Sequence, residues 1–252
     1  MIFREPKVSE LPRLKEIWKE AFDDGDDVLD DFERTAFSPS RTRVAAVGEE
    51  IAAALYFFDC ECDGERIAYL YAIATAKKHR GRGICRALMA DTHRHLKTLG
   101  YRGALLSPAE DSLFIFYERL GYTRVGYLKE ILTSASGKCA KLTEIDKSEY
   151  ALLRRGLLTS GAVIQEGASL DFLETQEKFY RGEDFILCAH AEGDFLSGAE
   201  LIGNTSSAAD ILTALGCKNG IFRTVGGEKR FFSYLPFTDT SPRPTYFALA
   251  LD

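Results

Sequence analysis

Arg80-Gly81-Arg82-Gly83-Ile84-Cys85 is the stretch that decides the fold. The apolar run before it, residues 67–75, predicts a strand, and the amphipathic run after it, residues 86–99, predicts a helix. A helix start carries N–H groups without intrahelical partners and positive potential from the helix dipole. Gly81 and Gly83 have no Cβ, so the backbone there can turn tightly and approach a ligand closely. The stretch therefore predicts a cradle for a phosphate or pyrophosphate.

The spacing of this loop disfavours two other phosphate-binding motifs. A P-loop needs a Lys-Ser/Thr pair after its second glycine, and none follows Gly83. The Rossmann fingerprint needs a third glycine, which is missing, and this loop lies far from the N-terminus. Taken alone, six residues of this kind also fit a basic surface turn.

Composition limits the classes of partner. The chain has 252 residues, of which 46% are hydrophobic, enough for one large domain or two small ones with a real core. Its net charge is −6, so we expect it to bind neither nucleic acid nor an anionic membrane. The N-terminus has no signal-peptide pattern, and no apolar run approaches the about 18 residues that span a bilayer. We therefore expect a cytoplasmic protein.

The cysteines predict buried or half-buried free thiols in a reducing compartment, because none forms a CxxC pair and only four histidines accompany them. Cys60 and Cys62 lie two apart and should face the same side of a strand. We expect neither a disulfide framework nor a metal site. The six are Cys60, Cys62, Cys85, Cys139, Cys188 and Cys217.

Hydrophobic periodicity predicts the elements of the first half. We expect helices over 8–22, with Ser9 as N-cap, and 26–36, then strands over 43–47, 50–61 and 66–75. After the loop we expect a helix over 82–99, a strand over 103–106, a short helix starting at Asp111 or Ser112, and a strand over 122–132.

The second half begins after a joint at residues 134–138. Its pattern predicts helices over 148–158, 170–180 and 206–215, a hairpin of 185–190 with 195–202, and strands over 221–225, 231–237 and 245–251. This order echoes the first half without a sequence repeat. Residues 203–207 contain no arginine and no second glycine, so the second half should lack the cradle.

Two motifs together resemble the GCN5-related N-acetyltransferases (GNAT). Arg80, Gly83 and Cys85 occupy the positions of the family's Arg-x-x-Gly-x-(Gly/Ala) loop, with a cysteine in place of the smaller residue. Residues 116–122, Phe-Tyr-Glu-Arg-Leu-Gly-Tyr, resemble its Phe-Tyr-x-x-x-Gly-Phe/Tyr signature, one helix and one strand further on. The resemblance implies a mixed α/β fold with a splayed central sheet. It implies a GNAT domain over 1–134, followed by a smaller, degenerate GNAT-like domain over 140–252 that lacks the coenzyme A loop.

The resemblance also implies an activity, the transfer of an acetyl group from acetyl-CoA, as co-substrate, to an amine without a metal. Tyr117 matches the tyrosine that protonates the departing thiolate in many members. An ordinary phenol, with a pKa near ~10, is protonated at neutral pH and can donate. The expected cofactor contacts are Ile73 and Thr75 with the pantetheine arm, and Arg80, Gly81, Arg82, Gly83, Ile84, Cys85 and Arg86 with the pyrophosphate.

This chain departs from the family in two places. Glu110 stands where members often carry an asparagine, and Tyr71 stands where many carry a basic glutamate. The base could be water or a carboxylate, with Asp23, Asp24, Asp59, Glu61 and Glu110 as candidates. By similarity to the "enhanced intracellular survival" acetyltransferases, the terminal carboxylate of Asp252 is a further catalytic candidate. The departures leave open an alternative, an acyl-CoA-binding sensor or scaffold without turnover.

The acceptor is the least determined part. The resemblance implies a small-molecule or peptidyl amine. The acidic residues 23–31 favour a cationic acceptor such as a polyamine, an aminoglycoside or a lysine-like amine, although a solvated helix face would look the same. The sequence leaves open whether the chain acts alone or as a homodimer.

Overall fold

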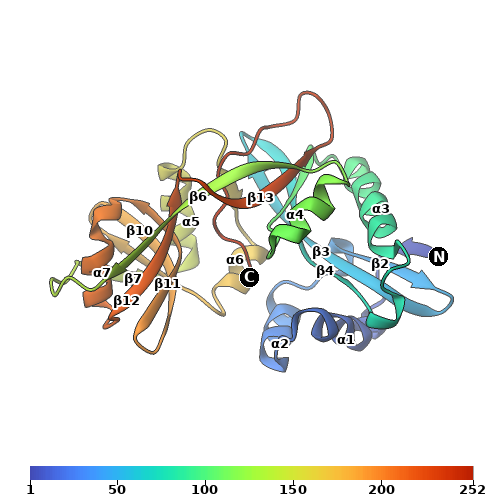
Figure 1. Cartoon of the computed structure of the whole chain (residues 1–252), viewed down its shortest axis with the longest axis horizontal. Coiled ribbons are helices and arrows are strands. Elements are labelled where there is room, and N and C mark those ends of the chain that lie inside the picture. The colour runs from blue at the N-terminus through green and yellow to red at the C-terminus, as the bar shows by residue number, and fades with distance from the viewer. Residues whose placement is uncertain (252) are drawn as a thin grey trace.

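The computed structural model describes residues 1–251 of the chain. Two halves lie side by side, with the N-terminal half at the right of Figure 1. In this part of the chain, thirteen strands join in one sheet that passes through both halves. Twelve of them follow the order β1-β2-β3-β4-β5-β13-β6-β12-β11-β10-β9-β7, and β8 pairs with β3.

The first elements form two layers, a sheet and the helices on one of its faces. They are β1 (Ile2–Arg4), η1 (Val8–Glu10), α1 (Leu11–Phe22), α2 (Asp26–Thr35), η2 (Pro39–Arg41), β2 (Thr42–Val47), β3 (Glu50–Cys62), β4 (Glu65–Thr75) and η3 (Lys77–His79). Trp18 of α1 and Phe32 of α2 pack against Tyr56 of β3, with ring centroids 4.8–5.1 Å apart. Burial of these aromatic rings holds both helices on the sheet.

The next two helices, α3 (Ile84–Thr98) and α4 (Asp111–Glu118), cover the opposite face. The strands that alternate with them, β5 (Gly103–Leu106) and β6 (Thr123–Ser134), belong to the sheet itself. The apolar side of α3, carrying Leu88, Met89 and Leu96, is buried against the small and apolar residues of β3. Helix α4 adds Tyr117 to the same core.

The sheet splays between β4 and β5. These parallel strands share only the pairs Ala68 with Ala104 and Tyr69 with Leu105, after which they separate. Just beyond that point β4 bulges, because Tyr71 pairs with Tyr56 and Ala74 with Ala54, leaving one extra residue on β4. Ala72 takes up this extra length at a φ of 44°, a left-handed value that is rare for a residue with a side chain.

The second half repeats part of this plan. Its elements are β7 (Leu142–Ile145), α5 (Lys147–Leu157), β8 (Val163–Gln165), α6 (Ala168–Leu173), β9 (Lys178–Gly182), β10 (Phe185–Glu192), β11 (Phe195–Gly203), η4 (Thr205–Ser207), α7 (Ala208–Ala214), β12 (Asn219–Val225) and β13 (Lys229–Pro236). Strands β11 and β12 are parallel and joined through α7, as β4 and β5 are joined through α3.

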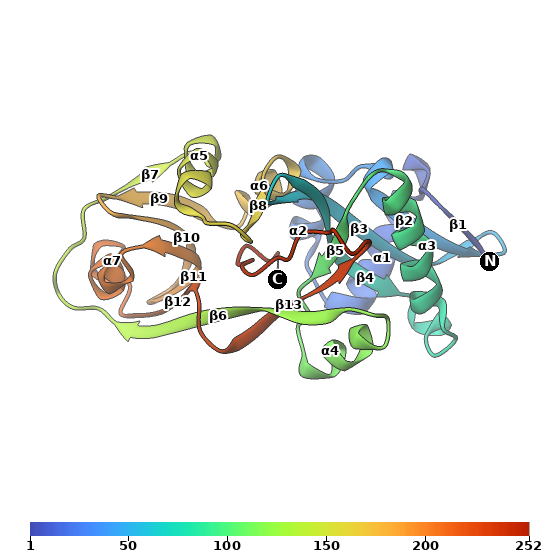
Figure 2. The same cartoon turned by 90° about the horizontal axis from the view of Figure 1, so that it is seen from above.

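The two halves exchange strands. Strand β13, from the second half, lies between β5 and β6, and β6, from the first half, pairs with β12 (Figure 2). The ring of Phe232 covers Gly126 so closely that a Cβ there would lie 1.6 Å from it, so this pairing requires a glycine. Strand β8 crosses in the other direction and pairs with the end of β3.

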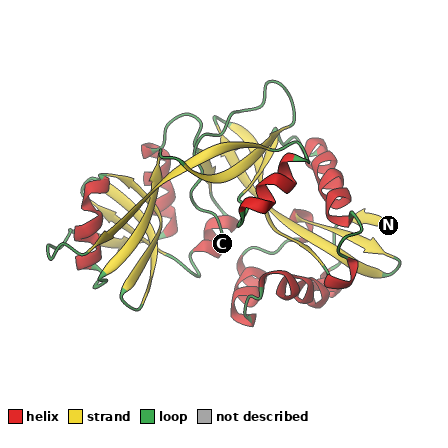
Figure 3. Cartoon of the chain, in the orientation of Figure 1, coloured by secondary structure: helices red, strands yellow, loops and turns green. Residues whose placement is uncertain are grey.

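The C-terminal segment, residues 246–251, lies buried between the halves, where Figure 3 draws it as loop. The Tyr246 hydroxyl donates to Glu200 at 2.9 Å, and the ring of Phe247 lies 4.9 Å from that of Tyr69 on β4. Gln165 donates to the Leu249 carbonyl at 2.7 Å. The segment therefore contacts both halves.

Several predicted elements are wrong. Ser9 caps no helix, since a 3₁₀ turn at Val8–Glu10 precedes α1 and Glu10 occupies its N-cap. The helix expected over 170–180 is instead α6 followed by β9, because Phe179 belongs to a strand paired with β10. The strand expected over 245–251 makes only the single bridge of Ala162 with Tyr246, because side chains rather than a strand partner surround it.

The short strands β1, β7 and β8 were not predicted. The cysteines are unpaired throughout the described chain, and Cys60, Cys62, Cys188 and Cys217 are buried. Cys139 is exposed, which differs from the expectation of buried or half-buried thiols.

Candidate active site

A cavity of about 350 Å³ fills the split between β4 and β5. Its walls come from five parts of the chain: β4, the turn after β5, the end of α1, helix α4 and the C-terminal segment. The lining residues are Tyr69, Leu70, Tyr71, Ala72 and Ile73, then Leu106, Ser107, Pro108 and Ala109, then Trp18, Phe22 and Asp24, then Leu113 and Tyr117, and last Ala250 and Leu251.

Tyr117 reaches this cavity from α4. Its side chain is 8% exposed and packs edge-on against the rings of Phe116 and Tyr122. Burial raises the pKa of the Tyr117 phenol above its usual range, and the nearby Cys85 adds to the shift. The phenol is therefore protonated at neutral pH and can donate a proton.

The loop predicted to hold a pyrophosphate has the expected backbone form. Gly81 and Gly83 have φ values of 74° and 73°, and no atom lies within 4 Å of where a Cβ would stand on either. The first backbone bond into α3 runs from the Ala87 N–H to the Gly83 carbonyl at 3.1 Å, so the three N–H groups before Ala87 precede the helical ladder. Neither Arg82 nor Arg86 forms an ion pair within residues 1–251, and both are exposed. This helix start can accept an anion.

Arg80 has a structural role in the loop. Its Nε donates to the Thr75 carbonyl at 2.9 Å and its Nη2 to the Glu20 carbonyl at 3.1 Å, which ties the loop to the end of β4 and to α1. Cys85 packs into the core beside Tyr117, where burial raises the pKa of its thiol to about 11. A thiol in that state is a poor nucleophile at neutral pH.

The predicted contacts on β4 differ in position. Ile73 lines the cavity beside the bulge, and neither it nor Ala72 has a register partner on β3. Thr75 and residues 80–86 do not line it. The buried Oγ1 of Thr75 has no hydrogen-bond partner within the described residues.

Of the five carboxylates considered as the base, one lines the cavity. Asp24 does so, and the indole Nε1 of Trp18 donates to its Oδ2 at 2.6 Å. Asp23 is an exposed left-handed cap at the end of α1, and Glu110 is exposed at the N-cap of α4. Asp59 and Glu61 face a different cavity. Tyr71, at the position of the missing glutamate, stands 5.4 Å from Trp18 between ring centroids.

The proposed catalytic Asp252 lies outside the described residues. The residue before it, Leu251, lines the cavity and donates its N–H to the Tyr69 hydroxyl at 3.2 Å. The apolar character of residues 246–251 predicts that this segment packs into the body of the protein, but it does not identify Leu251 as part of the cavity wall.

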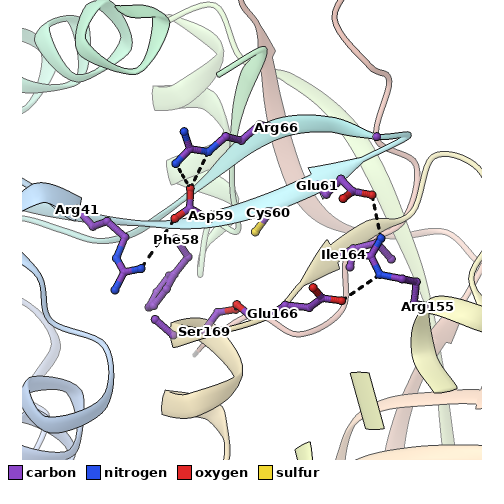
Figure 4. Close-up of a pocket in the computed structure, with 13 residues that line it drawn as sticks. Arg41, Phe58, Asp59, Cys60, Glu61, Arg66, Arg155, Ile164, Glu166 and Ser169 are labelled. Atoms are coloured by element: carbon purple, nitrogen blue, oxygen red, sulfur yellow. Dashed lines mark hydrogen bonds and ion pairs between the residues drawn. The ribbon is translucent and has the colours of Figure 1, made fainter. Parts of the chain in front are cut away.

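A second cavity, also about 350 Å³, lies where β8 meets β3 (Figure 4). Its charged side chains neutralise one another. Asp59 accepts from Arg66 at 2.9 Å, and Arg155 lies 3.0 Å from both Glu61 and Glu166. These matched pairs leave no charge for a ligand to satisfy, so the split between β4 and β5 is the better candidate site.

No described helix combines the length and the apolar character that a bilayer crossing requires. The described residues also contain no group of three side chains arranged to hold a metal ion.

The structure resembles several solved GNAT proteins. One from Anabaena variabilis superposes with a TM-score of 0.71 at 15% identity, covering 92% of this chain and 72% of that one. One from Kribbella flavida gives 0.69 at 15% identity, covering 92% and 70%. A tandem GNAT protein from the clavulanic acid biosynthesis pathway gives 0.57 at 11% identity, covering 95% and 99%. At such identities the likeness establishes the fold, a mixed α/β GNAT fold that extends over both halves.

No curated protein matches the sequence. The family model described as acetyltransferase (GNAT) domain matches residues 3–125, the part that holds the loop, the split and Tyr117. Residues 3–125 of this chain therefore belong to the GNAT acetyltransferase family, and the chain as a whole has the fold of the tandem GNAT proteins.

Proposed function

We propose that the protein transfers an acetyl group from acetyl-CoA to a primary amine, with Tyr117 as general acid. The observation that carries this proposal is the cavity in the split. It brings the Tyr117 phenol to the same space as the unpaired bulge of β4 at Ala72 and Ile73.

The residues around the split fit coenzyme A. The N–H groups at the start of α3 and the guanidinium groups of Arg82 and Arg86 suit a pyrophosphate, and the open space beside Gly81 and Gly83 admits it. The bulged edge of β4 at Ile73 offers backbone polar groups to a pantetheine arm, and two residues further along lies the Thr75 hydroxyl, which is buried and has no hydrogen-bond partner among the described residues. We assign the pyrophosphate to residues 80–86 and the arm to Ile73 and Thr75.

The thioester supplies an activated carbonyl carbon, which the amine nitrogen attacks as the C–S bond breaks. An amide at the bulge, near Ile73, is placed to stabilise negative charge on the carbonyl oxygen. Tyr117 gives its proton to the departing sulfur, and solvent restores that proton. The raised pKa of Tyr117 keeps the donor protonated before the reaction.

The attacking amine must also lose a proton. Among residues 1–251, Asp24 is the carboxylate in the cavity that can accept this proton, directly or through a water molecule. Asp252, which lies outside the described residues, is the second proposed acceptor. Either route ends with the proton on a carboxylate or in solvent.

We also propose that residues 140–252 form a degenerate GNAT-like domain after the domain at 1–134. The parallel pair β11 and β12, joined through α7, supports this. The connection after β11 differs from the loop at residues 80–86. A Cβ on Gly203 would lie 2.2 Å from the Asp184 carbonyl, whereas the corresponding space beside Gly81 and Gly83 is open.

The test is release of the free thiol of CoA from acetyl-CoA in the presence of a panel of amines. Tyr117→Phe should lower kcat by about 10²–10⁴-fold and leave acetyl-CoA binding unchanged, because it removes the proton donor and keeps the ring. Tyr127→Phe, on the exposed side of β6, is the matched control and should have no effect.

A second candidate is the sensor or scaffold without turnover, which the missing glutamate at Tyr71 favours. Acetyl-CoA binding without amine-dependent thiol release across the panel would establish it. Equal activity of Tyr117→Phe and the unaltered protein would remove the proposed role of Tyr117.

A further inference from the structure

The acceptor side of the cavity has aromatic and apolar walls. Trp18 lies 6.1 Å from Phe22 and 5.4 Å from Tyr71, and Tyr71 lies 6.0 Å from Tyr69, measured between ring centroids. Leu113 and Leu251 add aliphatic side chains to the same lining. Such walls favour a ligand body that is itself apolar or aromatic, and ring faces also attract a cation.

Asp24 is the acidic side chain that this lining contains within residues 1–251. The Trp18 indole holds its Oδ2 at 2.6 Å, which fixes the carboxylate at the edge of the aromatic wall. The lining offers no second carboxylate in the described part of the chain, and Ser107 supplies its remaining polar side chain apart from the tyrosine hydroxyls. The described lining can therefore satisfy one positive charge, through Asp24.

The rest of the acidic run does not add to this charge. Lys15 bridges Asp30 at 2.7 Å and Glu33 at 2.5 Å. Asp26 is paired with Lys19, and Asp31 with Arg34. Three of the five other carboxylates in this run are thus paired with cations on α1 and α2, and the remaining two, Asp23 and Asp27, are exposed and do not line the cavity. This arrangement weakens the case for a polycationic acceptor.

We infer that the acceptor is a small primary amine with one positive charge on an aromatic or alkyl body, an inference that rests on the proposed acetyl transfer. Asp24 recognises the ammonium group, and the faces of Trp18, Phe22 and Tyr71 enclose the body. A second ammonium on the same body would lie among these rings and leucines, where residues 1–251 offer it no carboxylate, at a large desolvation cost.

The inference is tested by comparing kcat/KM for phenethylamine, hexylamine, cadaverine and spermidine at saturating acetyl-CoA. We expect phenethylamine and hexylamine to exceed cadaverine and spermidine by at least about tenfold, because the second charge goes unpaired. Hexylamine and cadaverine are a matched pair, since their chains are alike and they differ in the second amine.

Substitutions of Asp24 and of a control residue then test whether Asp24 recognises the ammonium group. Asp24→Asn should raise KM for phenethylamine by about tenfold or more, because it removes the carboxylate that pairs with the ammonium, and should leave KM for acetyl-CoA unchanged. Asp27→Asn is the control. Asp27 belongs to the same acidic run but is exposed on α2 and does not line the cavity. Equal effects of the two substitutions would overturn the role of Asp24.

A binding measurement separates this inference from the proposed function. Trp18 is the single tryptophan of the chain, so its fluorescence reports directly on the acceptor side of the cavity. We expect phenethylamine to quench this fluorescence as it binds the unaltered protein. The dissociation constant obtained from the quenching should be about tenfold higher for Asp24→Asn. Turnover that prefers spermidine would overturn the inference while the transferase survives. Acetyl-CoA binding with no transfer to any amine would overturn the transferase, and the inference with it.

Discussion

The backbone N–H of Leu251 donates to the hydroxyl of Tyr69 at 3.2 Å, which joins the C-terminal segment to the strand that borders the split. Both residues line the cavity. The segment is therefore a wall of the candidate site as well as a packing element between the halves.

Tyr69→Phe should loosen that wall. A typical hydrogen bond contributes about 1 kcal/mol, so we expect kcat/KM for the amine to fall by about fivefold, with KM for acetyl-CoA unchanged. Steady-state kinetics in both substrates measures this. Tyr127→Phe controls for loss of a hydroxyl elsewhere on the sheet, and an unchanged amine kcat/KM in Tyr69→Phe would exclude a role for this contact.

Alanine substitutions at Gly83 and Gly100 can separate the cost of backbone strain from the loss of contact with CoA. Gly83 and Gly100 have φ values of 73° and 83°, and neither would place a Cβ within 4 Å of another atom. Alanine at either position should therefore cost a similar amount of stability, about 1 kcal/mol. Gly83→Ala should in addition weaken CoA binding by about tenfold or more, because its methyl group occupies the space that the pyrophosphate needs. Urea unfolding and calorimetric titration with CoA give the two quantities, and equal CoA affinity in both variants would place the pyrophosphate elsewhere.

Much of the first half could be predicted from the sequence. The strand over 103–106 has the predicted bounds, and α3 begins two residues after its predicted start because Gly83 provides the left-handed cap. These elements have clear periods and strong terminating residues. The helix predicted over 170–180 failed because Leu170, Phe172, Leu173 and Phe179 fit a helical period, whereas β9 owes its form to its pairing with β7 and β10.

The exchange of β6 and β13 could not be predicted, since the period of a strand does not reveal its partner. The motif residues Tyr117 and Ile73 could be placed at the site from the sequence alone. Asp24 was one of five carboxylates, and only its contact with Trp18 and its place in the cavity separate it from Asp23. That distinction depends on the conformation of the turn after α1, which the spacing of residues in the sequence does not reveal.

Glu200 anchors the C-terminal segment through its hydrogen bond with Tyr246. It is fully buried and accepts hydrogen bonds from Tyr150 at 2.6 Å, from Arg154 at 2.6 and 2.9 Å, and from Tyr246 at 2.9 Å. Glu200→Gln leaves Arg154 buried without its counter-charge, so we expect a loss of about 3–5 kcal/mol in unfolding free energy by urea denaturation.

The control for this substitution is Glu166→Gln, which removes a carboxylate from a solvent-exposed pair with Arg155. We expect it to cost about 1 kcal/mol or less. The double variant Glu200→Gln with Arg154→Met should lose less than the sum of the single variants, because it removes both charges. Additive losses would show that the pair is not coupled.

His93 makes the fold sensitive to acid. This residue of α3 is half-buried against Tyr122, whose hydroxyl lies 2.8 Å from its Nε2. Burial, with a smaller contribution from Lys97, lowers the pKa of His93 to about 4. The unfolded chain, with an ordinary histidine pKa of about 6.5, binds this proton more readily, so stability falls as pH falls from about 6.5 towards 4. We expect His93 to account for about 1–2 kcal/mol of the loss between about pH 7 and pH 5. Urea unfolding at both pH values should show a flatter dependence in His93→Gln. Tyr122→Phe should keep the original dependence, because burial rather than the hydroxyl is the main cause, and a flattened dependence in Tyr122→Phe would assign the effect to the hydrogen bond instead.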